Sequence, residues 1–304
     1  MAFPWVPSST IPRPDPRRLE DLRSHYGLFA LAGTWRKMHR METFQDISLA
    51  LILVTFAASF AACFFSSLSG GGAGLILLPV LLFTGLPFIN ALASHKLAVG
   101  FIGIGSTIRY VRERLIDWPV FWWTALVGLP FVVLGTRFAA SVPGEVMEPL
   151  VGGVIIAMVL ITLAKKAAPD LFDPARLSPR LLLIGSLFLV PAAFYSGWIS
   201  AGSGVFTTFI YLWLLRYDQL HATAMTLAAN GIFWNGVGAV AHVFMGHVIW
   251  PLAPGLILGA LFGSYFGASF GIKRGNRFLR LMFLGTAAVT GIILLYPTLR
   301  GLID

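Results

Sequence analysis

The sequence predicts an all-α, polytopic membrane protein built from two five-segment repeats, each with four long helices and one short broken half-helix. Three observations carry this prediction. Hydrophobic residues make up 57% of the 304 residues and charged residues only 12%, whereas soluble domains carry about 25% charged residues. Long apolar segments recur along the chain. Two glycine-rich interruptions repeat within this apolar sequence.

The first 45 residues form a basic tail. Residues 1–16 hold five prolines and are predicted to be disordered. Residues 17–43 fit either a basic amphipathic helix on the membrane surface or a loosely ordered tail, because apolar residues recur at helical spacing among arginines and lysines. The net charge of +9 lies in the tail and loops, so it is interpreted as orienting the protein in a bilayer rather than binding nucleic acid.

Eight apolar segments are long enough, at 1.5 Å per residue, to cross or nearly cross a hydrocarbon core about 30 Å thick. They lie at 47–68, 88–110, 118–141, 146–164, 181–199, 219–243, 250–271 and 278–297. The first begins too late and runs too long for a cleaved signal peptide, so we expect a permanent span. Two further segments, 74–84 and 204–215, are too short to cross comfortably as straight helices.

The short segments belong to an internal repeat. FFSSLSGGGAGLI at 64–76 matches FYSGWISAGSGVF at 194–206, which aligns Gly72 with Gly202. Further along, GTRFAAS at 135–141 meets GSYFGAS at 263–269. The predicted domains are therefore the tail (1–45), transmembrane repeat 1 (46–165), a charged linker loop (166–180) and transmembrane repeat 2 (181–298).

Paired interrupted segments in a duplicated membrane unit are typical of secondary transporters. If the short segments cross, each unit has five crossings and the repeats are inverted; if they are re-entrant, the repeats are parallel. With ten crossings and the N-terminus outside, the basic loops 109–117, 165–180, 216–218 and 272–280 all lie in the cytoplasm. With eight crossings and the N-terminus inside, the last of these loops lies outside the cell, although the basic tail then lies in the cytoplasm. Because short loops follow the positive-inside rule better than long tails, charge favours the inverted arrangement.

The glycines have a functional interpretation. A helix that starts in mid-membrane leaves about four amides without partners, and its positive dipole end attracts an anion. Glycine lets the backbone approach a ligand closely. Gly70–Gly74 and Ala201–Gly204 are therefore predicted to form two facing anion cradles, each at the N-terminus of a short helix, with serine hydroxyls as further donors. The alternative is that the glycines only permit close helix packing.

Ionisable residues inside the spans also indicate that the bound solute is an anion. Lys96 lies about eight residues into its segment, His95 is its neighbour, and no Asp or Glu lies deep in a span to balance the lysine. Such residues are costly in a membrane and mostly functional. Arg137, near the end of its segment, can instead snorkel to the interface, and His95 can be a packing histidine. Asn230 and Asn235 are each predicted either to hydrogen-bond an oxyanion or to form hydrogen bonds between helices.

The predicted substrate-binding residues fall into four groups. From the first interruption they are Ser69, Gly70, Gly71, Gly72 and Gly74, and from the second Ser200, Ala201, Gly202, Ser203 and Gly204. From the spans they are His95, Lys96, Arg137, Asn230 and Asn235. Thr226 joins them because it aligns with Lys96 in the repeat.

The sequence resembles the TauE/SafE family of sulfite exporters and sulfonate permeases. The resemblance rests on SGGGAGLILLPVLLFTGLPFINALASHKLA (69–98) and a degenerate second copy, SAGSGVFTTFIYLWLLRYDQLHATAMTLAANG (200–231), and it covers about 47–297. It implies transport of sulfite, sulfoacetate, sulfonates or related sulfur anions.

Together, the residues and the resemblance predict a secondary transporter in a bacterial inner membrane that exports a small sulfur oxyanion by alternating access. The expected partners are the anion and membrane lipid, with a homodimer compatible with the sequence and no cofactor, metal or nucleic acid expected. Three alternatives are an anion channel, a proton-coupled uptake permease for a sulfonate or carboxylate, and a scaffold. An intramembrane enzyme is disfavoured, because only His95 near Ser94 approaches a nucleophile and base pair.

Overall fold

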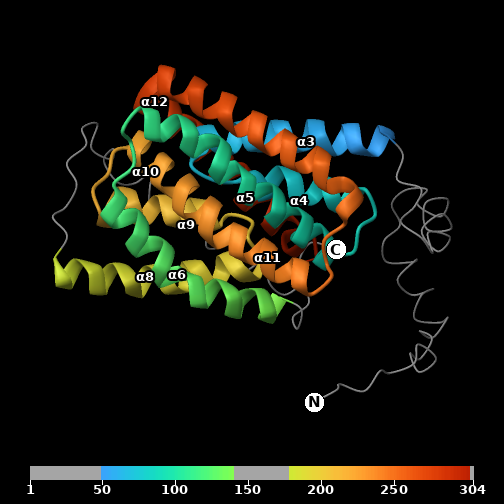
Figure 1. Ribbon diagram of the computed structural model, residues 1–304, viewed down its shortest axis with the longest axis horizontal. Coiled ribbons are helices and arrows are strands. Elements are labelled where there is room, and N and C mark those ends of the chain that lie inside the picture. The colour runs from blue at the N-terminus through green and yellow to red at the C-terminus, as the bar shows by residue number, and fades with distance from the viewer. Residues whose placement is uncertain (1–48, 140–177, 302–304) are drawn as a thin grey trace, which may run out of the picture. The chain divides into compact units, whose positions relative to one another are not determined.

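A computed structural model describes residues 49–139 and 178–301, and every regular element in them is helical (Figure 1). The all-α prediction is confirmed for these residues. The first part holds α3 (Leu49–Ser69), α4 (Ala73–Phe83), α5 (Phe88–Arg112) and α6 (Trp118–Ala139). The second part holds α8 (Pro179–Trp198), α9 (Ser203–Phe209), η3 (Ile210–Leu214), α10 (Gln219–Thr226), η4 (Leu227–Asn235), α11 (Gly236–Phe244), η5 (Trp250–Leu252) and α12 (Ala253–Gly301). The predicted tail, the segment at 146–164 and most of the linker lie outside the described residues.

Five of the described helices are long and apolar enough to cross a membrane. They are Leu49–Ser69, Phe88–Arg112, Trp118–Ala139, Pro179–Trp198 and the stretch Trp250–Gly285. Large apolar side chains on these helices point outward, and Leu183 and Leu187 on α8 are 74% and 73% exposed. An outer surface of this kind suits lipid, since contiguous apolar patches are rare on soluble proteins. The protein is a multi-pass membrane protein.

Hydrogen bonds between loops distinguish the two ends of the helix bundle. At one end the Asn90 side chain donates to the carbonyl of His247 at 2.8 Å, which joins the first turn of α5 to the loop after α11. At the other end the Tyr217 hydroxyl donates to the Asp117 carboxylate at 2.7 Å, which joins the α5–α6 turn to the loop before α10. We name these the His247 end, on the right in Figure 1, and the Tyr217 end, on the left.

The interrupted helix pairs enter the bundle from opposite ends. Helix α3 starts at the His247 end, because its Ile52 packs against Gly255 at the start of α12, and α4 returns to that end to meet α5. Helix α8 starts at the Tyr217 end, because its Gly185 packs on Trp123 near the start of α6. After the second interruption, α9 and the π-helix η3 run back to the Tyr217 end. Each short helix therefore turns back toward the end from which its long partner came.

Close packing of α3 on α12 depends on glycines spaced four residues apart. A Cβ added to Gly259, Gly263 or Gly267 would lie 2.3–2.5 Å from a carbonyl oxygen of α3. Small residues at this spacing let two membrane helices approach at backbone distance. These glycines therefore permit close helix packing. That is the role which the sequence analysis gave as the alternative for the interruption glycines.

The predicted connection at 272–280 is a tight turn inside α12. Gly275 has non-helical angles, φ 77° and ψ −177°, and the rings of Phe270 and Phe278 meet across it at 5.8 Å. The two expected segments, 250–271 and 278–297, are thus two halves of one element that reverses at a glycine. Positive φ is the reason that glycine suits this position.

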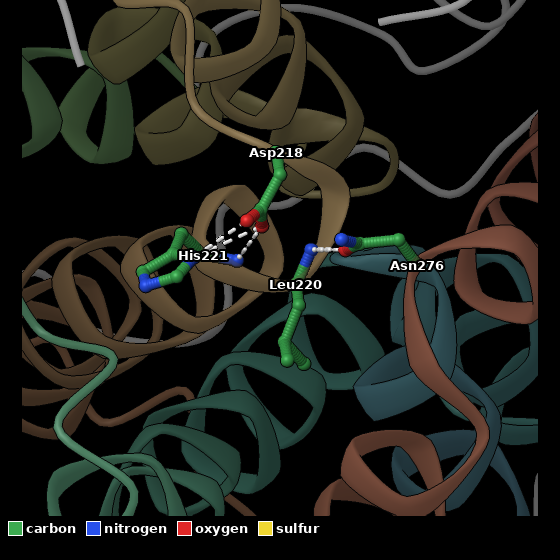
Figure 2. A network of polar contacts seen from close by, with 4 residues as sticks. All are labelled: Asp218, Leu220, His221 and Asn276. Carbon is green, nitrogen blue, oxygen red and sulfur yellow. Dashed lines mark hydrogen bonds and ion pairs between the residues drawn. The ribbon is translucent and has the colours of Figure 1, made fainter. Parts of the chain in front are cut away.

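A polar network ties this turn to the start of α10, as Figure 2 shows. The side-chain oxygen of Asn276 accepts from the Leu220 amide at 2.7 Å. Asp218 caps α10 by accepting from the His221 amide at 2.8 Å, and it also pairs with the His221 ring at 2.9 Å. Burial alone raises the pKa of Asp218, but its hydrogen bonds and charge interaction with His221 outweigh burial, and the pKa lies below its usual value. The network fixes the Tyr217 end of α10 against α12.

Candidate functional site

Both glycine-rich interruptions break the backbone in the same way. After α3, Gly70, Gly71 and Gly72 have φ values of 74°, 147° and 103°, and Gly72 is the N-cap of α4. After α8, Ser200 and Gly202 have φ values of 67° and 81°, and Gly202 is the N-cap of α9. Positive φ angles favour glycine, and this explains why Gly70, Gly71, Gly72 and Gly202 occupy these positions. The sequence prediction that each run starts a short helix is confirmed.

The two interruptions touch each other. A Cβ added to Gly71 would lie 2.7 Å from the backbone of Gly204, and one added to Gly204 would lie 2.7 Å from Gly71. Thr208 of α9 donates to the carbonyl of Gly70 at 2.7 Å across the same contact. Residues 130 or more positions apart in the sequence therefore form one site, in which backbone packs on backbone.

A cavity of about 30 Å³ lies between the interruptions. One water needs roughly 10–15 Å³ of such space, so a small solute is accommodated and a long one is not. The lining comes from both interruptions, α5 and η4: Ser66, Gly71, Gly72, Ala73, Gly74, His95, Val99, Ser200, Ser203, Gly204, Thr226, Leu227, Asn230, Gly231 and Asn235. None of these lining residues is acidic.

A chain of hydrogen bonds runs along the cavity wall. Ser200 contacts the Nε2 of His95 at 3.2 Å and donates to the Asn235 side chain at 2.7 Å. Asn235 donates in turn to the side-chain oxygen of Asn230 at 2.5 Å. Asn230 then donates to Thr207 of α9 at 3.0 Å. The polar side chains of three elements are thus held in fixed orientations around the cavity.

The π-helix η4 brings the two asparagines together. In an α-helix, residues five apart point about 140° away from each other at 3.6 residues per turn. In η4, Asn235 donates to both the backbone and side-chain oxygens of Asn230, at 3.1 and 2.5 Å. A π-helix aligns residues five apart, and such segments occur frequently at functional sites.

Several donors at the cavity are available to an anion. Neither short helix has a side-chain cap at its start, and a helix N-terminus carries a partial positive charge. In α9 the amides of Ser203 and Val205 donate to the carbonyls of Ser200 and Gly202. His95 is 1% exposed, and its Nδ1 has no hydrogen-bond partner within the described residues. A small pocket with helix N-termini, hydroxyls and amides, and no carboxylate, is suited to a small anion.

Ten of the sixteen predicted residues line this cavity. They are Gly71, Gly72, Gly74, His95, Ser200, Ser203, Gly204, Thr226, Asn230 and Asn235. Ser69, Gly70, Ala201 and Gly202 belong to the interruptions but are not among the lining residues. The Ser69 hydroxyl, for example, contacts the carbonyl oxygens of Phe65 and Gly71, at 3.1 and 2.5 Å.

The two predicted cations do not line the cavity. Arg137 is exposed in the last turn of α6. Lys96 is fully buried, and its Nζ donates to the carbonyl of Ser196 in the last turn of α8. A cation at a helix C-terminus is favourable, because it meets the negative end of the helix dipole. Lys96 therefore lies beside His95 in the chain but contacts α8.

Five lining residues were not predicted: Ser66, Ala73, Val99, Leu227 and Gly231. Ser66 could have been found, because it precedes the first interruption and aligns with Ser196 in the repeat. Gly231 lines the cavity where η4 crosses α5, and a Cβ there would lie 2.8 Å from Gly103. The apolar members give no signal that separates them from ordinary core residues.

Replacing Asn235 with Leu should destabilise the protein by about 1–3 kcal/mol, because the Ser200 hydroxyl and Asn230 amide oxygen lose a buried partner. Thermal unfolding of the purified protein in detergent checks this. Ser269→Ala is the matched control, since within the described part of the chain that hydroxyl bonds only to its own helix at Tyr265. An unfolding midpoint equal to that of the control would show that the asparagine pair adds nothing to the fold.

Interrupted helices that meet at a buried polar cavity inside a helical bundle are typical of secondary transporters. The comparison with known proteins agrees with this class. The family profile described as Sulfite exporter TauE/SafE matches residues 55–294, and the chain belongs to this family. It is a membrane transporter and not an enzyme, and the family implies a small anion as the transported solute.

Three bacterial relatives have similar sequences. The probable membrane transporter protein ORF9 of a Sinorhizobium species is 34% identical over 218 residues, which cover 71% of this chain and 80% of the relative. A probable membrane transporter protein of Haemophilus influenzae is 26% identical, covering 78% of this chain and 92% of the relative. YfcA of Escherichia coli K12, also a probable membrane transporter protein, is 27% identical over 265 residues, covering 85% and 96%. No solved structure matches the chain.

Proposed function

We propose that the protein is a secondary transporter that exports a small sulfur oxyanion, with sulfite as the leading substrate, across a bacterial inner membrane. The anion occupies the cavity between the two interruptions, where the starts of α4 and α9 supply the positive ends of their helix dipoles. The observation that carries this proposal is the contact of Gly71 with Gly204 beside a polar cavity that contains no acidic side chain. Membrane helices break at such a point where the freed backbone groups serve a ligand.

The size and chemistry of the cavity support a compact oxyanion. A volume of about 30 Å³ favours sulfite over an organosulfonate with a long chain. Three oxygens around one sulfur can accept from several donors at once, and the cavity lining includes the Ser66 and Ser203 hydroxyls and the ring of His95. Lys96 supplies positive charge from behind the cavity wall, since ion interactions act strongly at low dielectric constant.

The directions of the helices support alternating access between inverted repeats. The α3–α4 pair returns to the His247 end and the α8–α9 pair returns to the Tyr217 end, as two units related by inversion require. The predicted repeat boundaries, 46–165 and 181–298, are consistent with these pairs. In this mechanism the two halves rock about the cavity and expose it to one side of the membrane at a time.

The membrane potential supports export. A cytoplasm held negative drives an anion outward by about 2.3 kcal/mol per charge for each 100 mV. Uptake needs a coupled cation, and transporters commonly bind one with buried carboxylates. The described spans have no carboxylate in the cavity.

Purified protein in liposomes should exchange labelled sulfite across the membrane with saturable counterflow. Gly72→Val and Gly202→Val should each lower the rate by about tenfold or more, since valine disfavours the left-handed angles that start α4 and α9. Gly275→Val is a matched control, because Gly275 also has positive φ, 77°, has nothing within 4 Å of an added Cβ, and does not line the cavity. Flux that rises without saturation and shows no counterflow would identify an anion channel. An absence of sulfite flux would overturn the proposed substrate.

A further inference from the structure

A pair of histidines links the anion cavity to the His247 end of the bundle. His242 lies in the last turn of α11 and is fully buried, whereas His247 lies in the following loop and is partly exposed. Their Nδ1 atoms are 3.1 Å apart. At this distance one Nδ1 carries a hydrogen and the other accepts it, so the pair already shares one proton.

The other ring nitrogen of His242 takes no part in this hydrogen bond. Its Nε2 is buried and has no hydrogen-bond partner within the described residues. A buried polar atom without a partner is destabilising, so such atoms usually have a functional or structural explanation. A water molecule hydrogen-bonded to this nitrogen would remove the cost, and the same water would be the route by which a proton reaches the imidazole.

Lys96 lies between this pair and the cavity. A Cβ added to Gly238 of α11 would lie 3.3 Å from the Lys96 Nζ, so the lysine rests on the α11 backbone one turn before His242. On the other side, Lys96 follows His95, which lines the cavity. His95, Lys96, His242 and His247 therefore form a row from the cavity to the His247 end.

This row contains cationic groups and no described counter-charge. Among the described elements, those packed most closely against α11 are α5, α6 and η4. Helix α5 offers His95 and Lys96, α6 offers only the exposed Arg137 near this end, and η4 has no titratable residue. A proton on the histidine pair is therefore repelled by Lys96, unless an anion in the cavity offsets both charges.

We propose that His242 and His247 form a proton-binding site that is coupled to the anion cavity through Lys96. A proton arrives from water at the His247 end, binds the pair, and returns to the same water when the anion leaves. Because coupling between two binding sites is reciprocal, a bound proton raises the affinity for the anion, and a bound anion raises the affinity for the proton. This inference rests on the proposed function, since it needs an anion in the cavity.

The test is calorimetric titration of the purified full-length protein with sulfate at about pH 6 and about pH 8, the range in which histidine changes charge. Sulfate keeps its charge over this range; if it does not bind, sulfite compared at equal dianion concentration replaces it. The wild-type protein should bind the anion at least about fivefold more tightly at the lower pH, the lower bound of typical coupling. His242→Gln and His247→Gln should each bring this ratio close to one.

Two controls keep the result interpretable. His221→Gln removes a histidine at the opposite end that pairs with Asp218, and it should leave the pH ratio unchanged. At the higher pH the two pair variants should bind the anion as the wild type does, which shows that they are folded. A wild-type ratio of one, or a ratio that persists in both pair variants, overturns the proton site and leaves the proposed function intact. Failure of sulfate and sulfite to bind at either pH removes both.

Discussion

Gly71→Ala should reduce sulfite exchange in liposomes to a small fraction of the wild-type rate, by about tenfold or more, which corresponds to at least about 1.4 kcal/mol. The added methyl group would lie 2.7 Å from the backbone of Gly204, and backbone atoms cannot move aside as the end of a flexible side chain can. Gly71 also has a φ of 147°, which an alanine rarely adopts. The substitution therefore pushes apart the two interruptions that enclose the cavity.

The reciprocal variant separates strain at one residue from loss of the contact. Gly204→Ala adds its methyl group 2.7 Å from Gly71, but Gly204 has no unusual φ. We expect the same loss of exchange from both variants, with no further loss when they are combined. Gly285→Ala is the control, because nothing lies within 4 Å of its added Cβ. Wild-type exchange by Gly204→Ala would show that the two interruptions need not touch.

The sequence was sufficient to locate the interruptions, because their signal is local. Gly70–Gly72 and Gly202 interrupt apolar runs, and glycine is the residue that adopts the left-handed angles found there at the least cost, although Ser200 also adopts one. The internal match between the two runs then indicates that they have the same role. Residues chosen for this reason, such as Gly74 and Ser203, do line the cavity.

The contact between the interruptions could not be predicted in the same way. The sequence pattern shows that Gly71 and Gly204 belong to matched runs but not that their backbones meet, because this depends on how α3 and α8 cross the rest of the bundle. The joint role of Asn230 and Asn235 was hidden for another reason. Their spacing of five places them on one face only in a π-helix, and nothing in the sequence LAANGIFWN distinguishes a π-helix from an α-helix.

Lys96 shows the limit of reasoning from charge and depth. A lysine deep in a span without a carboxylate was predicted to meet the substrate. The structure gives its ammonium group a protein partner, the Ser196 carbonyl. Sequence depth identified an unusual residue but not the direction of a long, flexible side chain. Whether its charge still acts on the anion is a matter of distance and dielectric constant, and it can be measured.

Lys96→Met should weaken sulfite binding by at least about tenfold, because two unit charges about 8 Å apart attract by about 2 kcal/mol at an effective dielectric constant near 20. Methionine keeps an unbranched side chain of similar length, so the packing against Gly238 is largely retained. Binding by calorimetry and thermal unfolding should be measured on the same preparation. Lys273→Met, at an exposed position in α12, is the matched control and should change neither property.

The two measurements on Lys96→Met separate a role in anion binding from a role in capping α8. If the lysine only completes the last turn of α8, its loss lowers the unfolding midpoint and leaves the affinity for sulfite unchanged. If its charge attracts the anion through the cavity wall, the affinity falls even at a temperature where the variant is fully folded. We expect the second result, since the described spans offer no carboxylate to balance a buried ammonium group, and the transported anion is then the available counter-charge. Unchanged affinity in a folded Lys96→Met protein would remove Lys96 from the anion site and, with it, the link from the cavity to His242.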